Sequence, residues 1–552
     1  MKTIWEQGYY VWGQGLAISA VVAAIPTVVL LYLLAVKRKP AWIAALVGLA
    51  MTLIVAVAGY RMPISLAASS AAYGAAFGLF PICWIVFWAI VLYNVTVHTG
   101  KFAIIKDSIG SLTSDMRLQA LIIAFVFGAF IEGVSGFGTP IAVAGAMMVG
   151  LGFSPYYAAA LCLLANTAPV AFGSIGLPVI TLAGVTGLPL DRLSGMVGQL
   201  CAPISLILPA YLIVAMGSFG SALEIWPALL VSGSVFAAVQ YFVSNFVGVQ
   251  LTVILSSMAA MCALILLLRV WQPKASTAKK RSGPDPFAVT ADPAAPAHAP
   301  KYTFGQAILG WMPYIFLVVL VLLWSYKPLV AILNVATFPI QWPALHNLIL
   351  RVPPAVAKSS PYPAVFNLNL LSASGTACMF ATFLSAIFLK MSLRHFGKVV
   401  MATSRQLKFP ILTVATVLSL AFVMNYSGAT GTLGLAFAGT GKVFPFFSPF
   451  LGWLGVFLTG SDTSANALFG SLQVVTARRL GLSPILIAAS NSAGGVMGKM
   501  ISLQSIAVAA AATGITVQQQ SQLLRFTLKH SIFLATLIGF EVLAYAYLFH
   551  IV

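Results

Sequence analysis

The sequence predicts an all-α, polytopic membrane protein, and three observations lead to that class. The chain of 552 residues is 60% hydrophobic and only 7% charged, whereas soluble domains carry roughly 25% charged residues. Apolar runs of about 17 to 25 residues recur along it, each long enough to span a bilayer as a helix. The runs are continuous rather than alternating, which argues against a barrel of strands. We expect about 12 to 14 transmembrane or re-entrant helices, with two structural repeats that contain broken helices.

The apolar runs predict the spans one by one. The first is longer than the apolar part of a signal peptide, and its basic cluster follows it, so we expect it to stay in the protein. The predicted spans lie near residues 14–36, 41–59, 80–97, 198–217, 226–244, 248–271, 306–326, 369–389, 484–512 and 531–551. Six prolines between Pro339 and Pro363 predict a non-helical outer loop.

The basic residues explain the net charge of +19. They cluster at span ends and in the Pro/Ala-rich segment 272–305, which favours a cytoplasmic linker and an external N-terminus. The two clusters outside the linker are Lys37, Arg38, Lys39 and Lys390, Arg394, Lys398, Arg405, Lys408. We therefore expect contact with lipid headgroups and none with nucleic acid. The cysteines form no C-x-x-C pair, so no disulfide framework or metal site is expected.

Two segments, 118–187 and 409–480, break the apolar pattern repeatedly with Gly, Ser, Thr, Asn and Pro. EGVSGFGT at 132–139 matches NYSGATGT at 425–432, and ANTAPVAFGS at 165–174 matches SDTSANALFGS at 461–471. The similar offset predicts an internal duplication. The domains expected from this are N-terminal spans 1–79, repeat one 80–245, a connecting span 246–271, the linker 272–305, a span with the outer loop 306–368, and repeat two 369–552.

Breaks in membrane helices expose backbone N–H groups, which favour an anion. Facing breaks rich in Gly, Ser, Thr and Asn predict a small carboxylate site near the middle of the membrane. The residues expected to bind the substrate are Gly136, Phe137, Gly138, Thr139, Asn166, Thr167, Ser427, Ser461, Thr463, Asn466, Asn491 and Lys499.

Glu132 and Asp462 are the two acids that fall at these breaks. An ionised carboxylate in the bilayer costs at least about 2.5–3.5 kcal/mol, so acids there tend to be functional. We expect both to be proton-coupling residues. The alternative for either is a helix cap, since Ser461-Asp462-Thr463 resembles an N-cap cluster. Lys499 is expected to meet the substrate or to neutralise Asp462, and its alternative is a lysine that reaches the membrane interface.

Enzyme motifs are absent from the sequence. The glycines at 133, 136 and 138 lack the G-x-G-x-x-G spacing, and there is neither H-E-x-x-H nor G-x-S-x-G. We expect a protein that is not an enzyme and that uses no cofactor.

The stretches EGVSGFGTP, NTAPVAFGS, FFSPFLGWLGVFLTGSDTSANALF and GGVMGKMISLQSIA resemble the bacterial L-lactate permease family. The resemblance runs from the first span to the last. It implies symport of L-lactate, D-lactate or glycolate, which are 2-hydroxymonocarboxylates, with a proton across the bacterial plasma (inner) membrane. It also implies kinship with transporters whose repeats are inverted.

Alternatives remain at this point. A sodium-coupled carboxylate carrier and an anion channel fit the composition too, and a homo-oligomer is left open. The inversion is also unsettled, because span counting places 101–117 and 390–408 on the same face, whereas inverted repeats need them on opposite faces.

Overall fold

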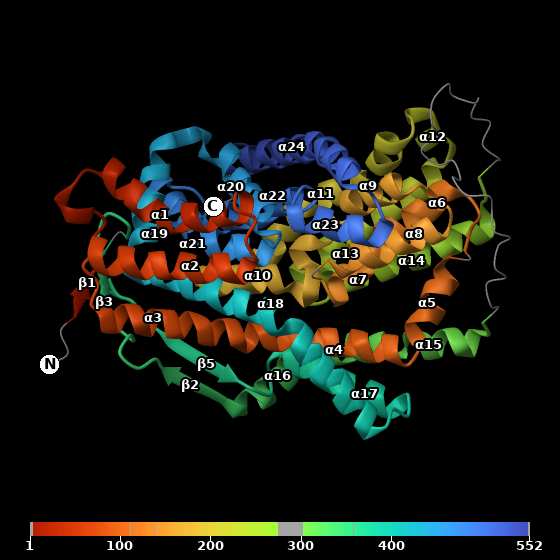
Figure 1. Cartoon of the computed structure of the whole chain (residues 1–552), viewed down its shortest axis with the longest axis horizontal. Coiled ribbons are helices and arrows are strands. Elements are labelled where there is room, and N and C mark those ends of the chain that lie inside the picture. The colour runs from red at the N-terminus through yellow and green to blue at the C-terminus, as the bar shows by residue number, and fades with distance from the viewer. Residues whose placement is uncertain (1–3, 111, 137, 274–301, 357, 550–552) are drawn as a thin grey trace.

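The computed structural model describes residues 4–549 except 111, 137, 274–301 and 357. Within these residues, 12 helical stretches are long and apolar enough to cross a membrane. The predicted all-α polytopic class is therefore confirmed. Figure 1 shows many of the long helices running along the longest axis of the molecule, with the strands gathered toward one end.

The part of the chain before the linker is almost entirely helical. Its helices are α1 (Leu16–Ala35), α2 (Ala41–Ile54), α3 (Ile64–Phe77), α4 (Trp84–His98), α5 (Lys101–Gly110), α6 (Met116–Ala120), α7 (Gly128–Val134), α8 (Thr139–Gly150), α9 (Pro155–Ala165), α10 (Gly173–Thr186), α11 (Leu190–Met216), α12 (Phe219–Glu224), α13 (Trp226–Phe246) and α14 (Thr252–Val270). Short π or 3₁₀ segments accompany them, namely η1 (Val11–Gly13), η2 (Val55–Gly59), η3 (Gly78–Cys83), η4 (Leu121–Phe127) and η5 (Val170–Phe172).

The part after the linker combines helices with the strands. Its helices are α15 (Phe304–Ser325), α16 (Lys327–Leu333), α17 (Ser374–Phe388), α18 (Leu393–Ser427), α19 (Ala429–Phe437), α20 (Phe444–Thr459), α21 (Asp462–Leu480), α22 (Pro484–Lys499), α23 (Leu503–Thr513) and α24 (Val517–Tyr547), with η6 (Asn334–Ala336) and η7 (Ala438–Val443). The strands within the described residues are β1 (Trp5–Glu6), β2 (Thr337–Gln341), β3 (Ile349–Arg351), β4 (Ser360–Pro361) and β5 (Val365–Asn369).

Two predicted spans differ from the structure. The span predicted near 80–97 is the second part of a helical stretch of 35 residues, Ile64–His98. The first part, α3, was not predicted as a span because its small residues lower its hydropathy. The same small residues let α3 pack closely. A Cβ on Gly74 would lie only 2.6 Å from the carbonyl oxygen of Leu418 in α18. The run 369–389 holds α17, whose 15 residues are fewer than the roughly 20 that span a bilayer.

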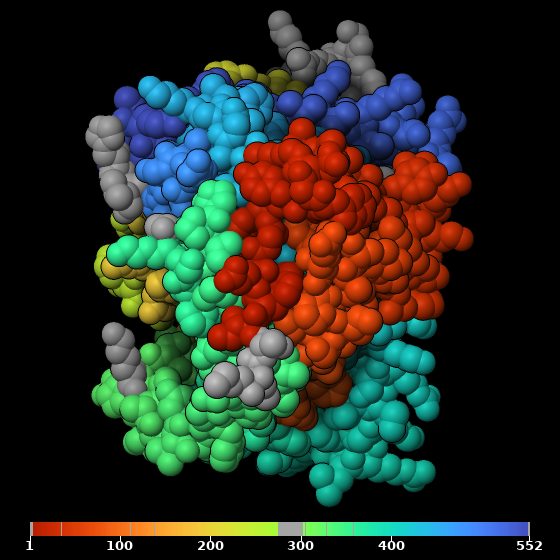
Figure 2. Space-filling model, turned by 90° about the vertical axis from the view of Figure 1, so that its left-hand side faces the viewer, coloured from red at the N-terminus to blue at the C-terminus, as the bar shows by residue number. Residues whose placement is uncertain are grey.

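The strands tie the start of the chain to the loop around residue 350. β1 pairs in parallel with β3, with Trp5 opposite Ile349, and β4 pairs with the other edge of β3. β2 and β5 form a separate antiparallel hairpin. Figure 2 shows the red N-terminal segment lying against the green loop. The predicted non-helical character of 339–363 is confirmed for its described residues, while most of the predicted linker 272–305 lies outside the described residues.

Several helix breaks fall inside the two segments that the sequence singled out. α7 and α8 are separated at Gly138, α18 and α19 at Gly428, and α20 and α21 at Gly460, each glycine with a positive φ between 73° and 92°. Only glycine adopts this conformation readily, so the sequence fixes where the helices end. α9 and the η5–α10 segment form a further broken pair, bent by 66°.

The predicted pairing of repeats is not confirmed, although two other segments share helix-end signals. α9 and α22 each start at a proline that follows a serine, Ser154 and Ser483. α10 and α23 each end before a left-handed glycine, Gly187 and Gly514. The segments α9–α10 and α22–α23 thus share their start and end signals.

Candidate functional site

The broken helices meet at a cavity of about 240 Å³. This is below the roughly 300–1,000 Å³ of pockets for drug-sized ligands, so the cavity suits a small molecule. Its polar lining comes from the ends of broken helices, and its apolar lining comes partly from α2 and α18. The lining residues are Ala41, Trp42, Glu132, Val170, Gly173, Ser174, Leu177, Pro178, Phe409, Pro410, Thr413, Val414, Thr459, Gly460, Ser461, Asp462, Thr463, Ser464, Lys499 and Gln504.

Three ionisable side chains from three different helices line this cavity. Glu132 lies in α7, Asp462 begins α21 and Lys499 ends α22, and their exposed fractions are only 4%, 3% and 7%. Lys499 attracts both carboxyl groups electrostatically. The described residues nevertheless contain no direct ion pair between Lys499 and either acid. The arrangement is thus one buried cation shared by two acids at longer range.

Lys499 is held by the helix break itself. Its Nζ donates a hydrogen bond of 2.7 Å to the carbonyl oxygen of Gly460, which is the C-cap of α20. A cation at a helix C-terminus is favoured by the carbonyl dipoles there. The buried position contradicts the alternative of a lysine that reaches the membrane interface.

Asp462 is not the cap of its helix. The N-cap of α21 is Ser461, whose Oγ accepts a hydrogen bond from the backbone N–H of Ser464 at 3.3 Å. The carboxylate of Asp462 instead accepts a hydrogen bond of 2.5 Å from Ser492 on one oxygen, while Oδ1 is buried with no hydrogen-bond partner among the described residues. Burial of a carboxyl oxygen without a hydrogen-bond partner costs free energy. A role as a helix cap therefore does not explain the buried position of Asp462.

Glu132 is likewise short of partners. Its Oε2 is buried without a hydrogen bond to any residue that the structure describes, and Asn166 lies beside the carboxyl. A Cβ on Gly173 would come within 2.7 Å of Oε1, so the glycine at the start of α10 leaves the space that Glu132 occupies. Each acid therefore has an oxygen that is free to carry a proton or to contact a ligand.

A layer of buried amides and hydroxyls lies behind Asp462. The amide of Asn466 contacts Asp462 Oδ2 at 3.5 Å and donates to Pro178 O at 3.1 Å. Asn491 donates to Asn466 at 2.9 Å, and Gln473 donates to Asn491 at 3.2 Å. This network links α21 with α22 and fixes the position of the carboxylate.

The structure brings five of the predicted site residues to the cavity wall: Glu132, Ser461, Asp462, Thr463 and Lys499. Others stand behind the wall. Asn466 and Asn491 form the network just described, and Asn166 and Thr167 are buried in the α9–α10 break. Gly136 lies behind Ser174, and Gly138 lies near Val508.

The remaining predicted residues are not part of the lining. Thr139 starts α8, and Ser427 donates to Met424 O at the end of α18. Phe137 lies outside the described residues. Sequence reasoning missed Trp42, Phe409, Ser174, Thr459 and Gln504, although Ser174 belongs to the stretch ANTAPVAFGS that had already been singled out.

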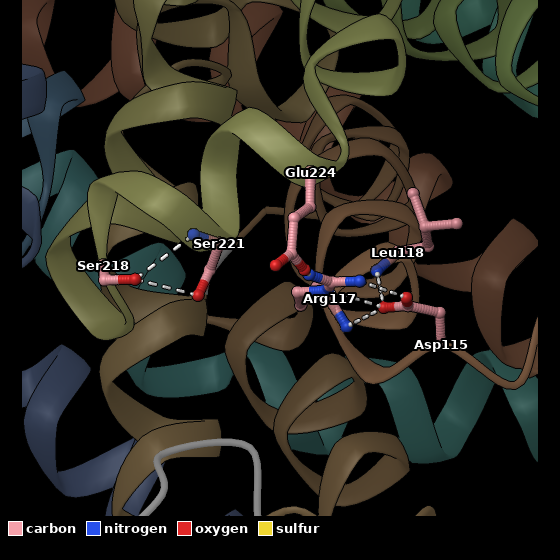
Figure 3. Close-up of polar contacts among 6 residues, drawn as sticks. All are labelled: Asp115, Arg117, Leu118, Ser218, Ser221 and Glu224. Atoms are coloured by element: carbon pink, nitrogen blue, oxygen red, sulfur yellow. Dashed lines mark hydrogen bonds and ion pairs between the residues drawn. The ribbon is translucent and has the colours of Figure 1, made fainter. Parts of the chain in front are cut away.

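A second charged cluster lies at the start of α6, away from the cavity. Arg117 donates to both carboxylate oxygens of Asp115, at 3.1 and 2.7 Å, and also pairs with Glu224 at the end of α12 (Figure 3). Burial raises the pKa of Asp115, but the hydrogen bonds and charge of Arg117 outweigh this and leave the pKa of its carboxyl below the ordinary value. The cluster ties α6 to α12.

The chain is similar over nearly its whole length to known proteins of one family. The family model described as L-lactate permease matches residues 19–549. The chain is 45% identical to glycolate permease GlcA of Escherichia coli K12, covering 99% of this chain and 98% of that one. It is 46% identical to L-lactate permease of Bacillus subtilis 168, covering 97% of each, and 43% identical to L-lactate permease of E. coli K12, also covering 97% of each.

One solved structure shares the fold. MtrF of Neisseria gonorrhoeae matches with a TM-score of 0.50 at 12% identity, covering 94% of this chain and 97% of that one. At such low identity the likeness concerns the fold alone.

Proposed function

Because the chain belongs to the L-lactate permease family, we propose that it is a secondary carrier that symports a 2-hydroxymonocarboxylate with a proton. The substrates are L-lactate, D-lactate and glycolate. The chain is a multi-pass protein of a bacterial inner membrane, and the proton gradient across that membrane supplies the driving force.

The observation that carries the proposal is the presence of two buried acids around one buried lysine. With Glu132, Asp462 and Lys499 all ionised, the site has a net charge of minus one and repels a carboxylate. Protonation of one acid makes it neutral, and an anion then enters a site that still holds the ammonium group. Proton and substrate thereby favour each other's binding, which is the thermodynamic requirement for coupling.

The substrate carboxylate has two sources of attraction at this site. One is the charge of Lys499, and the other is the start of α21, whose first residues line the cavity. Backbone N–H groups and the helix dipole at a helix start favour an anion. The hydroxyls of Ser174, Ser461 and Thr463 are within the same lining and supply partners for the 2-hydroxyl of the substrate.

Sodium coupling is the alternative, and the position of Lys499 argues against it. A sodium site at a broken helix uses exposed backbone carbonyls. The Gly460 carbonyl at the α20–α21 break already accepts a hydrogen bond from Lys499, so an ammonium group occupies the place where a sodium ion would be coordinated.

Purified protein in liposomes tests the proposal. An inward proton gradient alone, without sodium, should drive labelled lactate above its equilibrium level, since each pH unit offers about 1.4 kcal/mol per proton, or roughly tenfold. Uptake that needs a sodium gradient and ignores pH would replace proton symport by sodium symport. Uptake that never exceeds equilibrium under either gradient would indicate a channel.

Selectivity is the second part of the test. An analogue without the 2-hydroxyl leaves the site hydroxyls unpaired, at a cost of about 1–3 kcal/mol. Propionate should therefore compete with labelled lactate more weakly than glycolate does, by about tenfold or more. Equal competition would mean that the site reads only the carboxylate.

A further inference from the structure

The cavity has an apolar side that neither the proton nor the carboxylate explains. Trp42 from α2 and Phe409 from α18 stack there, with ring centroids 5.3 Å apart and planes inclined by 24°. Val170, Leu177 and Val414 continue the same apolar lining. We call these five residues the apolar wall.

The aromatic pair of the apolar wall and the charged groups come from separate parts of the fold. Trp42, Phe409 and Val414 lie on α2 and α18, whereas the acids and Lys499 lie on α7, α21 and α22. A ligand in the cavity therefore has charge and hydroxyls among one set of helices and aromatic surface contributed by the other set. Such a two-sided site fits a molecule with a carboxylate at one end and an alkyl group at the other.

The aromatic pair is not a packed core element. Phe409 is 48% exposed, Trp42 is only partly buried, and the Lys408 ammonium lies 5.7 Å from the centre of the Phe409 ring. Both rings line the cavity, and contact between their apolar surface and an alkyl group favours binding.

We propose that the apolar wall is the subsite for the carbon chain beyond C2 of the substrate, and that Trp42 and Phe409 set the size limit of that chain. This inference rests on the proposed function and adds which lengths of substrate carbon chain the carrier accepts. Glycolate has no carbon beyond C2, lactate has one, and 2-hydroxyisovalerate has a branched chain. The three acids share the carboxylate and the hydroxyl, so they differ only in what they present to the apolar wall.

Such a subsite has a predictable magnitude. One methyl or methylene group in a hydrophobic pocket changes recognition by about 10- to 200-fold. Truncation of one ring to alanine removes contact for the methyl of lactate and opens space for a branched chain. Glycolate has no carbon beyond C2 that contacts the rings, so the truncation should leave its binding unchanged.

The alternative is that Trp42 and Phe409 are membrane-interface anchors, because both follow basic residues in sequence and Trp is enriched at interfaces. Anchors affect how much protein inserts and how stable it is. They do not alter the relative recognition of three acids by the protein that has inserted. The ratio of affinities therefore separates the two roles.

The experiment uses Trp42→Ala and Phe409→Ala in proteoliposomes, with unlabelled acids competing against labelled glycolate. The lactate-to-glycolate ratio of half-inhibitory concentrations should rise about tenfold or more, and the 2-hydroxyisovalerate-to-lactate ratio should fall by a similar factor. Phe409→Leu and Trp42→Phe, which keep apolar bulk, should show smaller changes in the same direction.

Phe242→Ala is the matched control. Phe242 also lies beside another exposed ring, Phe246, with ring centroids 5.3 Å apart and tilted planes, but it lies on α13 outside the cavity lining. It should leave both ratios unchanged. If all four wall variants keep both ratios within twofold of the wild type, the apolar subsite is wrong. If the wild-type protein itself transports neither glycolate nor lactate, the proposed function fails instead.

Discussion

At the scale of single residues, the buried acids decide how the carrier is coupled. Asp462→Asn keeps the size and most hydrogen bonds of the side chain but removes its charge. If Asp462 carries the proton, proton-driven accumulation of labelled lactate should fall to the equilibrium level, while lactate exchange across the membrane persists, because exchange does not require release of the proton. Unchanged accumulation with an unchanged pH profile would show that Asp462 does not take part in proton coupling.

Glu132→Gln provides the companion measurement in the same assay. Neutralisation of the acid that carries the proton should abolish accumulation of lactate but leave lactate exchange intact. Neutralisation of the other acid should not have this effect. Asn466, which lies behind the cavity wall and contacts Asp462, is not a suitable control. Glu6 is the better one, since its side chain is exposed on β1, far along the chain from either acid, and Glu6→Gln should leave both activities intact.

Lys499→Met tests the shared cation. The substitution keeps much of the length of the side chain but leaves two acids without a positive neighbour and frees the Gly460 carbonyl. We expect the apparent affinity for lactate to fall at least tenfold, which corresponds to about 1.4 kcal/mol. Measurement of the concentration dependence of uptake checks this. An unchanged apparent affinity would mean that the start of α21, without Lys499, binds the substrate carboxylate.

Residue chemistry was the part of the site that the sequence predicted best. Glu132, Asp462 and Lys499 stand out because charge inside an apolar run is rare and costly. Trp42 and Phe409 could not be found in this way, since an aromatic residue at a span end is ordinary. Only the packing of α2 beside α18 brings these two rings to the cavity.

At the scale of elements, small residues determine how closely helices approach. A Cβ on Gly452 in α20 would collide with the backbone carbonyl of Asn491 in α22. Gly452→Ala should therefore lower the melting temperature in detergent and the yield of folded protein, because overpacking costs about 1–3 kcal/mol. Gly439→Ala is the control, as its Cβ would meet nothing within 4 Å. Equal melting temperatures for the two variants would contradict the close crossing.

The tie between α6 and α12 predicts a pH dependence of stability. Because the pKa of Asp115 is lowered in the folded protein, its ion pair adds stability at pH above the unfolded pKa of about 3.9, and the contribution is lost as the pH falls through the folded pKa. Asp115→Asn should lower the melting temperature at pH 7. At a pH below the folded pKa, the difference from the wild type should disappear. A constant difference at both pH values would exclude the ion pair as its cause.

Elements also show why part of the fold could not be predicted. The continuous runs of Leu, Val and Phe gave most spans correctly, but α3 is rich in Ala, Ser and Gly and its hydropathy is too low to be recognised. The repeat pairing rested on short polar motifs, whereas the likeness of α9–α10 to α22–α23 lies in their helix starts and left-handed glycines. These become evident only once the helix bounds are known.

At the scale of the whole molecule, the positions of the strands and basic clusters predict the orientation. After replacement of the exposed Cys262, a cysteine at exposed Ser359 should react with an impermeant maleimide in intact cells. A cysteine at exposed Lys398 should react only after the membrane is opened. The reverse labelling would invert the topology that the basic residues favour.

The N-terminal segment contacts a helix break whose residues come much later in the chain. Gln7 donates hydrogen bonds of 2.9 Å to the carbonyl oxygens of Asn425 and Tyr426, just before the α18–α19 break, and Trp5 pairs with β3. At a synthesis rate of about 5–20 residues per second, the partners 418 residues away emerge roughly 20–80 s after Gln7. During biogenesis the first residues therefore remain without these partners until the second half of the protein has been inserted into the bilayer.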